Sequence, residues 1–572
     1  MILQALKEYY DRKPPAPEGW LWKEIPFLAV IDNQGRFVCF QDTREGEGRQ
    51  KRAKSFLVPS LGEKKGNGIK ANLFWENIEY MFGIPVPTKA KENPDPDRVK
   101  MQAKAFRDRI EGLRGSSISL DAARKFVKQN HADRVRKDSL WETVLATNQT
   151  ILLSLQGVGP VTDDSIVRDS VKSVEETKNA IGTCLVTGRR EEIARLEPPI
   201  KGVRGNDGKV ERALVSFNID SFNSFGKSKN YNSPIGKSTV SAYAAALNHL
   251  FSRDSKQRMQ VGDASTVFWA AKSEDVGFET DFSAFFGESP KDDPDRGTRV
   301  VEGLFSAVKT GAYADDRSDR RFYVLGLAPN ASRIAVRFWI VNTIAAMAGR
   351  IAQHFEGLRI AHGPKERETL SLFRLLVSTA VQGKAENIPP NLGGDTMRAI
   401  LEGLPYPQTL LQGAIRRIRA EREVTYPRAA LIKACLNRSS RYRNPNGKEE
   451  LSVALDETNA NVGYRLGRLF ATLEKIQSES HPGINATIRD KFYSAASSSP
   501  VTVFGNLMRL KNHHLNKLDH PGRKIFFEKL MGEIMSAVDA NGFPAHLRLD
   551  DQGRFAIGYY HQMQKFYEKR EV

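Results

Sequence analysis

The stretch around which this chain is organised, residues 184–250, reads CLVTGRREEIARLEPPIKGVRGNDGKVERALVSFNIDSFNSFGKSKNYNSPIGKSTVSAYAAALNHL. Residues 213–215 form a short apolar run that predicts a strand, and residues 238–249 repeat apolar side chains at helical spacing. The residues between them are rich in Asn, Ser, Gly, Lys and Phe and contain almost no acid. A loop this long inside a compact domain is typical of a functional segment, and the alternative is an ordinary polar connection.

The side chains of this loop suit a nucleic-acid partner. Amides and hydroxyls can bond to phosphate oxygens or base edges, and lysines supply positive charge. The aromatic rings offer surface to bury or to stack, which argues against disorder. We predict DNA contacts at Asn218, Ser221, Ser224, Lys227, Asn232 and Lys237, with further charge from Lys229 and with Phe217, Phe222, Phe225 and Tyr231 as the aromatic residues.

Two segments of this stretch, residues 226–228 and 236–239, end like a phosphate-binding loop. The first glycine of that motif is absent from both, because Ser221 and Tyr231 stand at the required positions. The sequence therefore does not predict a nucleoside triphosphatase.

Length and charge set the class of protein. The 572 residues suffice for roughly three or four average domains or two large ones. Apolar residues make up 40%, which is enough for hydrophobic cores and excludes a disordered chain. The 86 basic residues exceed the 68 acidic ones and give a net charge of +18. This excess favours a polyanionic partner, nucleic acid first and an anionic membrane second, and the alternative is a lysine-rich surface without a partner.

Motifs for metal binding, secretion and catalysis are missing from the sequence. Cys39, Cys184 and Cys435 lie far apart, with neither zinc spacing nor a disulfide framework. No signal peptide and no apolar window of about eighteen residues is present, so we expect a cytoplasmic protein that does not span a membrane. The histidines are scattered, the paired acids lie in turns and no serine has a nucleophile-elbow setting. We expect a binding protein with no cofactor.

The N-terminal region mixes helices and strands. Residues 2–10 predict a helix, residues 25–32 and 36–40 a hairpin, and residues 56–58 a strand. A glycine-rich basic loop, residues 62–72, precedes a predicted helix at residues 73–82, and a solvated turn is the alternative for that loop. Its candidate contacts with duplex DNA are Lys64, Lys65, Asn67, Lys70 and Asn72, of which Asn72 is the best candidate for reading a base edge.

The middle of the chain has further strand signals. Residues 151–161 predict two strands joined by a turn, and the alternative is a DNA-binding helix-hairpin-helix turn. Strands are also predicted at residues 266–269 and 321–327. Asn330 is placed to cap a helix over residues 331–355. On that helix Arg333 and Arg337 would share one face and contact the DNA backbone.

From about residue 366 onward strand signals end and helical patterns follow one another, separated by short loops. We therefore predict the α+β class, with a mixed α/β region over residues 1–365 and a helical bundle over residues 366–572. The densest basic segment, the basic helical tract (residues 416–443), would track phosphates, and a solvated surface is the alternative. Its basic residues are Arg416, Arg417, Arg419, Arg422, Arg428, Lys433, Arg438, Arg441 and Arg443.

Several motifs, taken together, resemble one protein family. They are MILQALKEYYDR at residues 1–12, IPFLAVIDNQGRF at 25–37, CLVTG at 184–188, IKGV at 200–203, VSFNIDSFNSFGK at 215–227, FYVLGLAPNASRIAVRFW at 322–339 and GRFAIGYYHQM at 553–563. In this order, over the whole chain, they resemble the large subunit of the type I-C CRISPR surveillance complex, Cascade. Phe225, Lys229 and Glu197 stand where that family has tyrosine, glutamine and histidine, which leaves open which polar contacts are kept.

The resemblance implies a non-catalytic subunit that lies at the 5′-handle end of the crRNA and contacts the Cascade backbone and handle-binding subunits. Such subunits read the short protospacer-adjacent motif (PAM) on double-stranded DNA, promote R-loop formation, hold the displaced strand and present a surface to the helicase-nuclease. The resemblance also implies that residues 451–572 exist as a separate small helical subunit translated from the same gene, after a polar linker at residues 442–461. Its candidate contacts with the DNA backbone are Arg465, Arg468, Lys475 and Arg489.

Two alternative functions remain open. A metal-dependent nuclease or polymerase-like enzyme acting on nucleic acid would need two or three carboxylates that converge on a metal. A general DNA-binding scaffold would bind without preference for a PAM.

Overall fold

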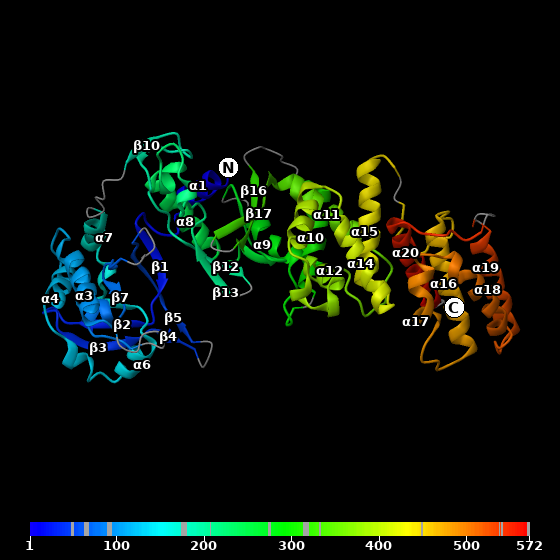
Figure 1. The fold of residues 1–572 in the computed structure, drawn as a ribbon, viewed down its shortest axis with the longest axis horizontal. Coiled ribbons are helices and arrows are strands. Elements are labelled where there is room, and N and C mark those ends of the chain that lie inside the picture. The colour runs from blue at the N-terminus through cyan, green and yellow to red at the C-terminus, as the bar shows by residue number, and fades with distance from the viewer. Residues whose placement is uncertain are drawn as a thin grey trace. The chain divides into compact units, whose positions relative to one another are not determined.

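A computed structural model describes residues 1–46, 51–61, 68–87, 94–172, 180–205, 208–272, 276–293, 295–312, 320–330, 333–447, 450–536, 538 and 542–568. The chain divides into two compact units (Figure 1). Unit 1 comprises Met1–Gly202, Lys209–Arg253 and Asn330–Ile334, and unit 2 comprises Val203–Gly208, Asp254–Pro329 and Ala335–Val572. Small sheets with helices precede a helical C-terminal region, which confirms the α+β class. The functional boundary at residue 365 stays a prediction.

Unit 1 is built on a sheet with the strand order β3–β2–β8–β7, in which β9 also pairs with β8. β2 (Phe27–Ile31) pairs antiparallel with β3 (Phe37–Asp42) and parallel with β8 (Ile151–Leu155). All five residues of β8 are buried, as expected for a strand that is covered on both faces. Helix α4 (Ile118–Val127) packs against β2 and β8 and buries Leu120, Phe126 and Val127.

The predicted β2–β3 hairpin is confirmed, and its turn shows why the sequence predicts it. Asp32 Oδ1 accepts hydrogen bonds from the backbone N–H groups of Gln34 (2.9 Å) and Arg36 (2.8 Å). Gly35 has a φ of 73°, and a Cβ there would lie 2.4 Å from the backbone nitrogen of Phe126. Only glycine fits this approach of the turn to α4.

The other strands of unit 1 form separate two-stranded sheets, β1–β6, β4–β5, β10–β11 and β12–β13. The remaining elements of unit 1 are α1 (Ile2–Arg12), β1 (Trp20–Glu24), β4 (Arg44–Glu45), β5 (Arg52–Ala53), β6 (Ser55–Pro59), β7 (Trp75–Glu76), α2 (Ile78–Phe82), α3 (Pro96–Glu111), α5 (Ala132–Val135), α6 (Trp141–Thr147), β9 (Gly159–Pro160), α7 (Ser165–Lys172), β10 (Ile181–Thr183), β11 (Arg190–Glu192), β13 (Gly208–Arg212) and α8 (Lys237–Leu250). β12 (Ile200–Gly205) pairs with β13.

Unit 2 begins with the antiparallel sheet β14–β15–β16–β17. Its strands are β14 (Arg258–Val261), β15 (Ala264–Ala270), β16 (Arg321–Asn330) and β17 (Arg333–Thr343). The prediction of a helix over residues 331–355 is wrong in its first half. Residues 333–343 form strand β17, and helix α11 (Ile344–Leu358) begins later, capped by Thr343, whose side chain accepts from the Ala346 N–H. Asn330 is therefore the last residue of a strand rather than a helix cap.

The helical bundle predicted from about residue 366 onward is confirmed. The helices of unit 2 besides α11 are α9 (Val276–Phe286), α10 (Arg296–Thr310), α12 (Leu372–Thr379), α13 (Leu392–Glu402), α14 (Gln408–Glu421), α15 (Tyr426–Arg443), α16 (Val462–Ser480), α17 (Ile488–Ala496), α18 (Val501–Leu515), α19 (Pro521–Met535) and α20 (Leu549–Tyr567). α20 packs on both α15 and α16. The contact with α16 is close, because a Cβ on Gly467 would lie 2.0 Å from the Phe555 carbonyl oxygen.

Two further predictions need correction, and two are confirmed. Residues 213–215 are not a strand, because β13 ends at Arg212 and the following residues bond to the loop itself. Residues 73–82 are helical only from Ile78, since β7 comes first and Phe74 has a φ of 68°. Residues 151–161 contain the predicted strand pair β8–β9 rather than a helix-hairpin-helix turn, and helix α8 is confirmed.

Candidate nucleic-acid interface

The polar loop (residues 213–236) connects β13 to α8, and it is tied to the body of unit 1. Near its C-terminal end, the Ala194 N–H donates to the Ile235 carbonyl at 3.0 Å. Asn230 is 2% exposed, and its side-chain amide donates to the Val215 carbonyl at 3.3 Å, which joins the two ends of the loop. The loop is therefore a folded element, as its aromatic content predicts.

The tip of the polar loop is a two-residue hairpin turn that presents an aromatic ring to solvent. The Lys227 N–H donates to the Ser224 carbonyl at 2.9 Å, and the Ser224 N–H returns a longer bond of 3.3 Å. Phe225 and Gly226 between them have φ values of 50° and 70°, as a type I′ turn requires. Phe225 is 98% exposed, and Lys227 beside it is exposed as well. An exposed aromatic ring can stack on a base, and an exposed lysine beside it can bond to a phosphate.

The ring of Phe222 lies behind this tip and is held from two sides. Phe217 meets it edge to face, with ring centroids 6.2 Å apart. The Arg333 guanidinium carbon lies 4.3 Å from the centre of the same ring, a cation–π contact. Arg337, which was predicted to share a helical face with Arg333, is exposed on β17 and pairs with Asp263 at 2.8 Å.

Some of the predicted polar side chains of the loop are exposed, and others are less exposed or bond to the loop itself. Asn218, Ser221 and Ser224 are exposed together with Lys227. Asn232 is half-buried, and its amide donates to the backbone carbonyls of Lys227 (3.2 Å) and Lys229 (3.0 Å). Asn232 therefore shapes the loop, and the four exposed residues are the ones that can meet a ligand. Lys237 is half-buried in the first turn of α8.

The sequence analysis missed an acid at the N-terminus of α8. Glu191 accepts hydrogen bonds from Ser238 Oγ (2.9 Å) and Thr187 Oγ1 (3.1 Å). A Cβ on Gly236, the residue that caps α8, would lie 2.0 Å from the Glu191 carboxyl carbon. The carboxylate takes the place that a phosphate would occupy at this helix end, in agreement with the missing phosphate-binding loop. The only signal of it in the sequence is the acid pair Glu191–Glu192, which follows two arginines.

In the glycine-rich loop, Lys64, Lys65 and Asn67 lie outside the described residues, and Lys70 is exposed. Asn72 is 6% exposed, and both its backbone N–H (2.8 Å) and its side-chain amide (3.0 Å) donate to Glu76 Oε1. The amide nitrogen of Asn72 is thus committed to Glu76, and a base contact from this residue would use its amide oxygen.

The basic helical tract contains arginines of two kinds. Arg416 and Arg422 are exposed, at the middle and at the end of α14. Arg417 lies 3.6 Å from Glu421, and Arg419 donates to Ser494 Oγ at 3.1 Å. Arg416 and Arg419 line an open groove of about 500 Å³, whose other walls come from α17 and α20.

The remaining buried basic side chains of the tract bond to groups inside unit 2. Lys433 is 1% exposed and donates to the Gly357 carbonyl at 3.2 Å. Arg438 donates to the carbonyls of Leu404 and Ala399, each at 2.6 Å. Arg428, likewise buried, bonds to Glu421 and to the Ser378 carbonyl. These side chains satisfy carbonyl groups inside the protein and are not available to phosphates in this structure.

Comparison with known proteins identifies the family. A sequence profile described as CRISPR-associated protein (Cas_Csd1) matches residues 6–567, nearly the whole chain. The chain belongs to this family. It is a Cascade-type large subunit, as the resemblance of its motifs predicts. No curated protein sequence matches the chain.

In this Csd1 chain, Lys475 and Arg489, two of the four phosphate contacts predicted in the C-terminal segment (residues 451–572), lie 3.6 Å from Glu479 and 3.7 Å from Glu474. The other two, Arg465 and Arg468, are buried. Arg465 is 6% exposed and donates to the carbonyls of Glu533 (3.3 Å) and Ile534 (3.2 Å). Arg468 is 2% exposed and donates to Gln562 Oε1 at 3.1 Å. Both arginines join α16 to later parts of the segment.

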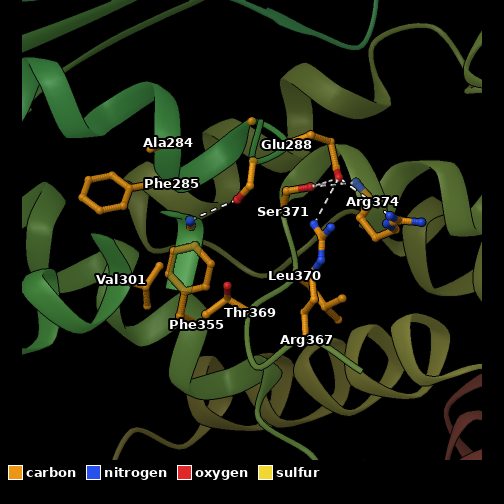
Figure 2. A pocket seen from close by; sticks show the side chains of 13 residues that line it. Ala284, Phe285, Glu288, Val301, Phe355, Arg367, Thr369, Leu370, Ser371 and Arg374 are labelled. Carbon is orange, nitrogen blue, oxygen red and sulfur yellow. Dashed lines mark hydrogen bonds and ion pairs between the residues drawn. The ribbon is translucent and has the colours of Figure 1, made fainter. Parts of the chain in front are cut away.

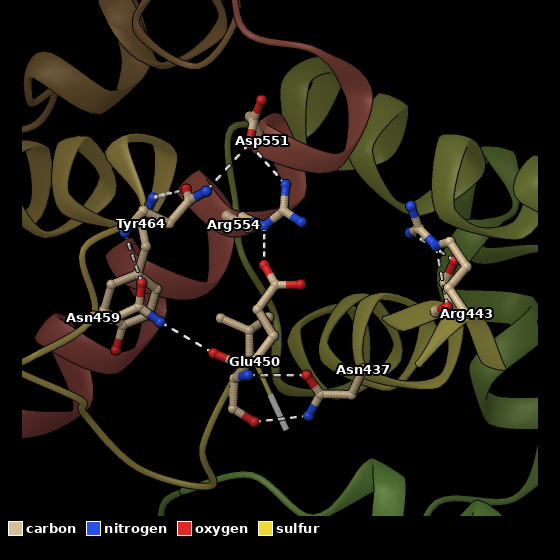
Figure 3. A network of polar contacts seen from close by, with 10 residues as sticks. Asn437, Arg443, Glu450, Asn459, Tyr464, Asp551 and Arg554 are labelled. Atoms are coloured by element: carbon tan, nitrogen blue, oxygen red, sulfur yellow. Dashed lines mark hydrogen bonds and ion pairs between the residues drawn. The ribbon is translucent and has the colours of Figure 1, made fainter. Parts of the chain in front are cut away.

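The predicted linker of the Csd1 chain is held by polar contacts on both sides (Figure 3). Asn437 of α15 exchanges two hydrogen bonds with the backbone of Leu451, donating at 2.7 Å and accepting at 2.9 Å. Glu450 pairs with Arg554 of α20, and Arg554 also donates to Asp551 at 2.7 Å. The Asn459 amide donates back to the Glu450 carbonyl at 3.1 Å.

A second polar site of unit 2 surrounds Glu288 (Figure 2). The guanidinium groups of Arg367 and Arg374 lie 3.9 Å and 3.7 Å from its carboxylate, and Ser371 Oγ donates to it. The cavity is small, about 30 Å³, and the carboxylate already balances the arginines. We therefore do not assign an anion to it.

The described residues contain no group of three or more His, Cys, Asp or Glu residues placed to hold a metal ion. No helix among the described ranges is long and apolar enough to cross a membrane.

Proposed function

We propose that this Csd1-family chain is the non-catalytic large subunit of a type I-C surveillance complex, and that it reads the PAM on double-stranded DNA. In that complex it would bind the crRNA handle end and the neighbouring Cas subunits. The observation that carries the proposal is the tip of the polar loop, where the exposed ring of Phe225 stands beside Lys227.

The geometry of the tip suits an opening duplex. An apolar side chain that enters a base step unstacks it and kinks the helix, at a cost of about a few kcal/mol that other contacts must offset. Exposed Lys227, Asn218 and Ser221 can supply such contacts to phosphates and base edges. Because the loop is already folded, little ordering entropy opposes binding. The same contact would promote R-loop formation ahead of the helicase-nuclease.

The exposed arginines of the basic helical tract extend the proposal to unit 2. Arg416 and Arg422 would bond to phosphates of the target strand or the displaced strand, and Arg416 lies at the groove formed by α14, α17 and α20. We also propose that the C-terminal segment is made a second time as a separate small subunit from the same gene.

Competition between PAM and non-PAM duplexes for the assembled complex tests PAM reading. In this proposal the ring of Phe225 enters a base step only beside a PAM. Stacking on a base is worth about 1–3 kcal/mol, so Phe225→Ala should lower the PAM preference by roughly 5- to 150-fold. The matched control is Val158→Ala, because Val158 is also apolar, 69% exposed and at the tip of a hairpin in unit 1. A wild-type PAM preference in Phe225→Ala would refute the assignment.

The non-catalytic part of the proposal has its own test. The purified chain, incubated with duplex and single-stranded DNA and with Mg²⁺ or Mn²⁺, should leave both substrates intact. Cleavage that co-purifies with the chain would favour the metal-dependent nuclease instead.

A further inference from the structure

We propose that Glu197 is the residue that positions the polar loop, because its buried carboxyl joins both ends of the loop to helix α8. This inference rests on the proposed function, since it concerns the shape in which the loop would meet DNA.

The carboxyl lies where three parts of unit 1 meet. Glu197 Oε2 accepts a hydrogen bond from the hydroxyl of Tyr243, a fully buried residue of α8. The Asn230 amide, from the C-terminal side of the loop, and the Val215 N–H, from its N-terminal side, both lie close enough to the carboxyl to lower its pKa. Because Asn230 also bonds to the Val215 carbonyl at 3.3 Å, these groups form one polar cluster, the loop clamp (Val215, Asn230, Tyr243 and Glu197).

The loop clamp contains an acid where a charge is poorly tolerated. Glu197 is 6% exposed, and its Oε1 atom is buried without a hydrogen bond of good geometry. Of the groups that face the carboxyl from the loop and from α8, only the Tyr243 phenol is titratable, and none is a cation. Burial raises the pKa of Glu197 from its ordinary 4.5 to about 8, against the opposing effect of the Asn230 amide and the Val215 N–H.

The direction of this shift gives the loop clamp a signature in pH. The carboxyl is neutral in the closed loop at pH 7 and ionises when the loop opens to water, so opening releases a proton. Between about pH 5 and pH 8 each unit of pH should therefore favour opening by about tenfold, and above pH 8 the effect should level off. A contact that only fills space would not give this profile.

Hydrogen exchange of the full chain measures the opening directly. After correction for intrinsic exchange, the protection of amides in the polar loop should fall about tenfold per pH unit between pH 5 and pH 8 in the wild type. In Glu197→Gln, which keeps the shape of the neutral acid, protection should not change with pH. The control Glu142→Gln removes an exposed carboxylate of unit 1 and should keep the wild-type profile. A flat wild-type profile would overturn the proposal.

DNA binding by the assembled complex supplies the second readout. Glu197→Ala, which removes the clamp, should lower the PAM preference about as much as Phe225→Ala, and Glu197→Gln should restore it. A wild-type preference in Glu197→Ala, while Phe225→Ala loses it, would refute the clamp alone. A wild-type preference in Phe225→Ala would refute the proposed function, whatever the exchange profile shows.

Discussion

Replacing exposed or buried arginines of the basic helical tract should have opposite effects on DNA binding and on stability. Arg416 and Arg422 are exposed on α14, whereas Arg438 is 6% exposed and bonds to two carbonyl oxygens. Replacing the first two should change DNA binding without changing stability. Replacing Arg438 should change stability without changing the salt dependence of binding.

The expected magnitudes follow from these contacts. Each lost phosphate contact lowers the log–log salt slope by about 0.9 for duplex and about 0.7 for single-stranded DNA. Arg416→Gln with Arg422→Gln should therefore flatten the slope by roughly 1.4–1.8 on every sequence alike. Charged hydrogen bonds contribute about 1.5–3 kcal/mol each, so Arg438→Met, which removes the two bonds to the Leu404 and Ala399 carbonyls, should cost roughly 3–6 kcal/mol.

Fluorescence anisotropy of the assembled complex between about 50 and 200 mM salt measures the slope, and urea unfolding of the isolated chain measures the stability. Lys137→Ala, an exposed lysine of unit 1 outside the polar loop, is the control for nonspecific loss of charge. An unchanged slope in the double variant would show that this face is merely solvated or packs against a neighbouring subunit.

Three further predictions follow from other parts of the chain. If Asn72 reads a base edge through its amide oxygen, Asn72→Ala should lower the PAM preference by about 1–3 kcal/mol, and a wild-type ratio in binding competition would restrict Asn72 to its structural bond with Glu76. If the C-terminal segment is also translated separately, the intact gene with a C-terminal tag should yield a second tagged band of roughly one-fifth the mass, and synonymous changes around codons 451–453 should abolish it. Burial lowers the pKa of His561 to about 4 and that of His354 to about 3, so as the pH falls the unfolded chain binds protons before the folded chain does. The urea concentration at the unfolding midpoint should therefore fall as the pH drops from 6.5 towards 4, and it should fall less steeply in His561→Gln.

The elements that the sequence predicts well are those with local signals. Asn461 accepts from the Tyr464 N–H and starts α16, and Asp32 with Gly35 closes the first hairpin within a few residues. Residues 333–343 carry no such local signal, because their strand forms by pairing with β16 in the sheet. Their spacing fits a helix as well, so the pairing with the preceding strand decides.

The candidate site is predicted in outline and not in its roles. The composition of the polar loop marks it as a candidate site, but a sequence does not show which of its aromatic residues are exposed. Here Phe222 packs against Phe217, whereas Phe225 is exposed to solvent. The same limit applies to the arginines, since Arg422 and Arg438 differ only in the carbonyl groups that distant helices bring to them. The role of Glu197 can be recognised only in the folded structure, where both ends of the loop lie near its carboxyl group.

The most direct test of the account is to replace Phe225 with photoreactive benzoylphenylalanine in the assembled complex and to map its crosslinks on a target duplex. The account predicts crosslinks at the base pairs next to the protospacer on the PAM side, and weaker ones when the PAM is changed. Crosslinks that are absent, or that are spread along the DNA without regard to the PAM, would contradict it.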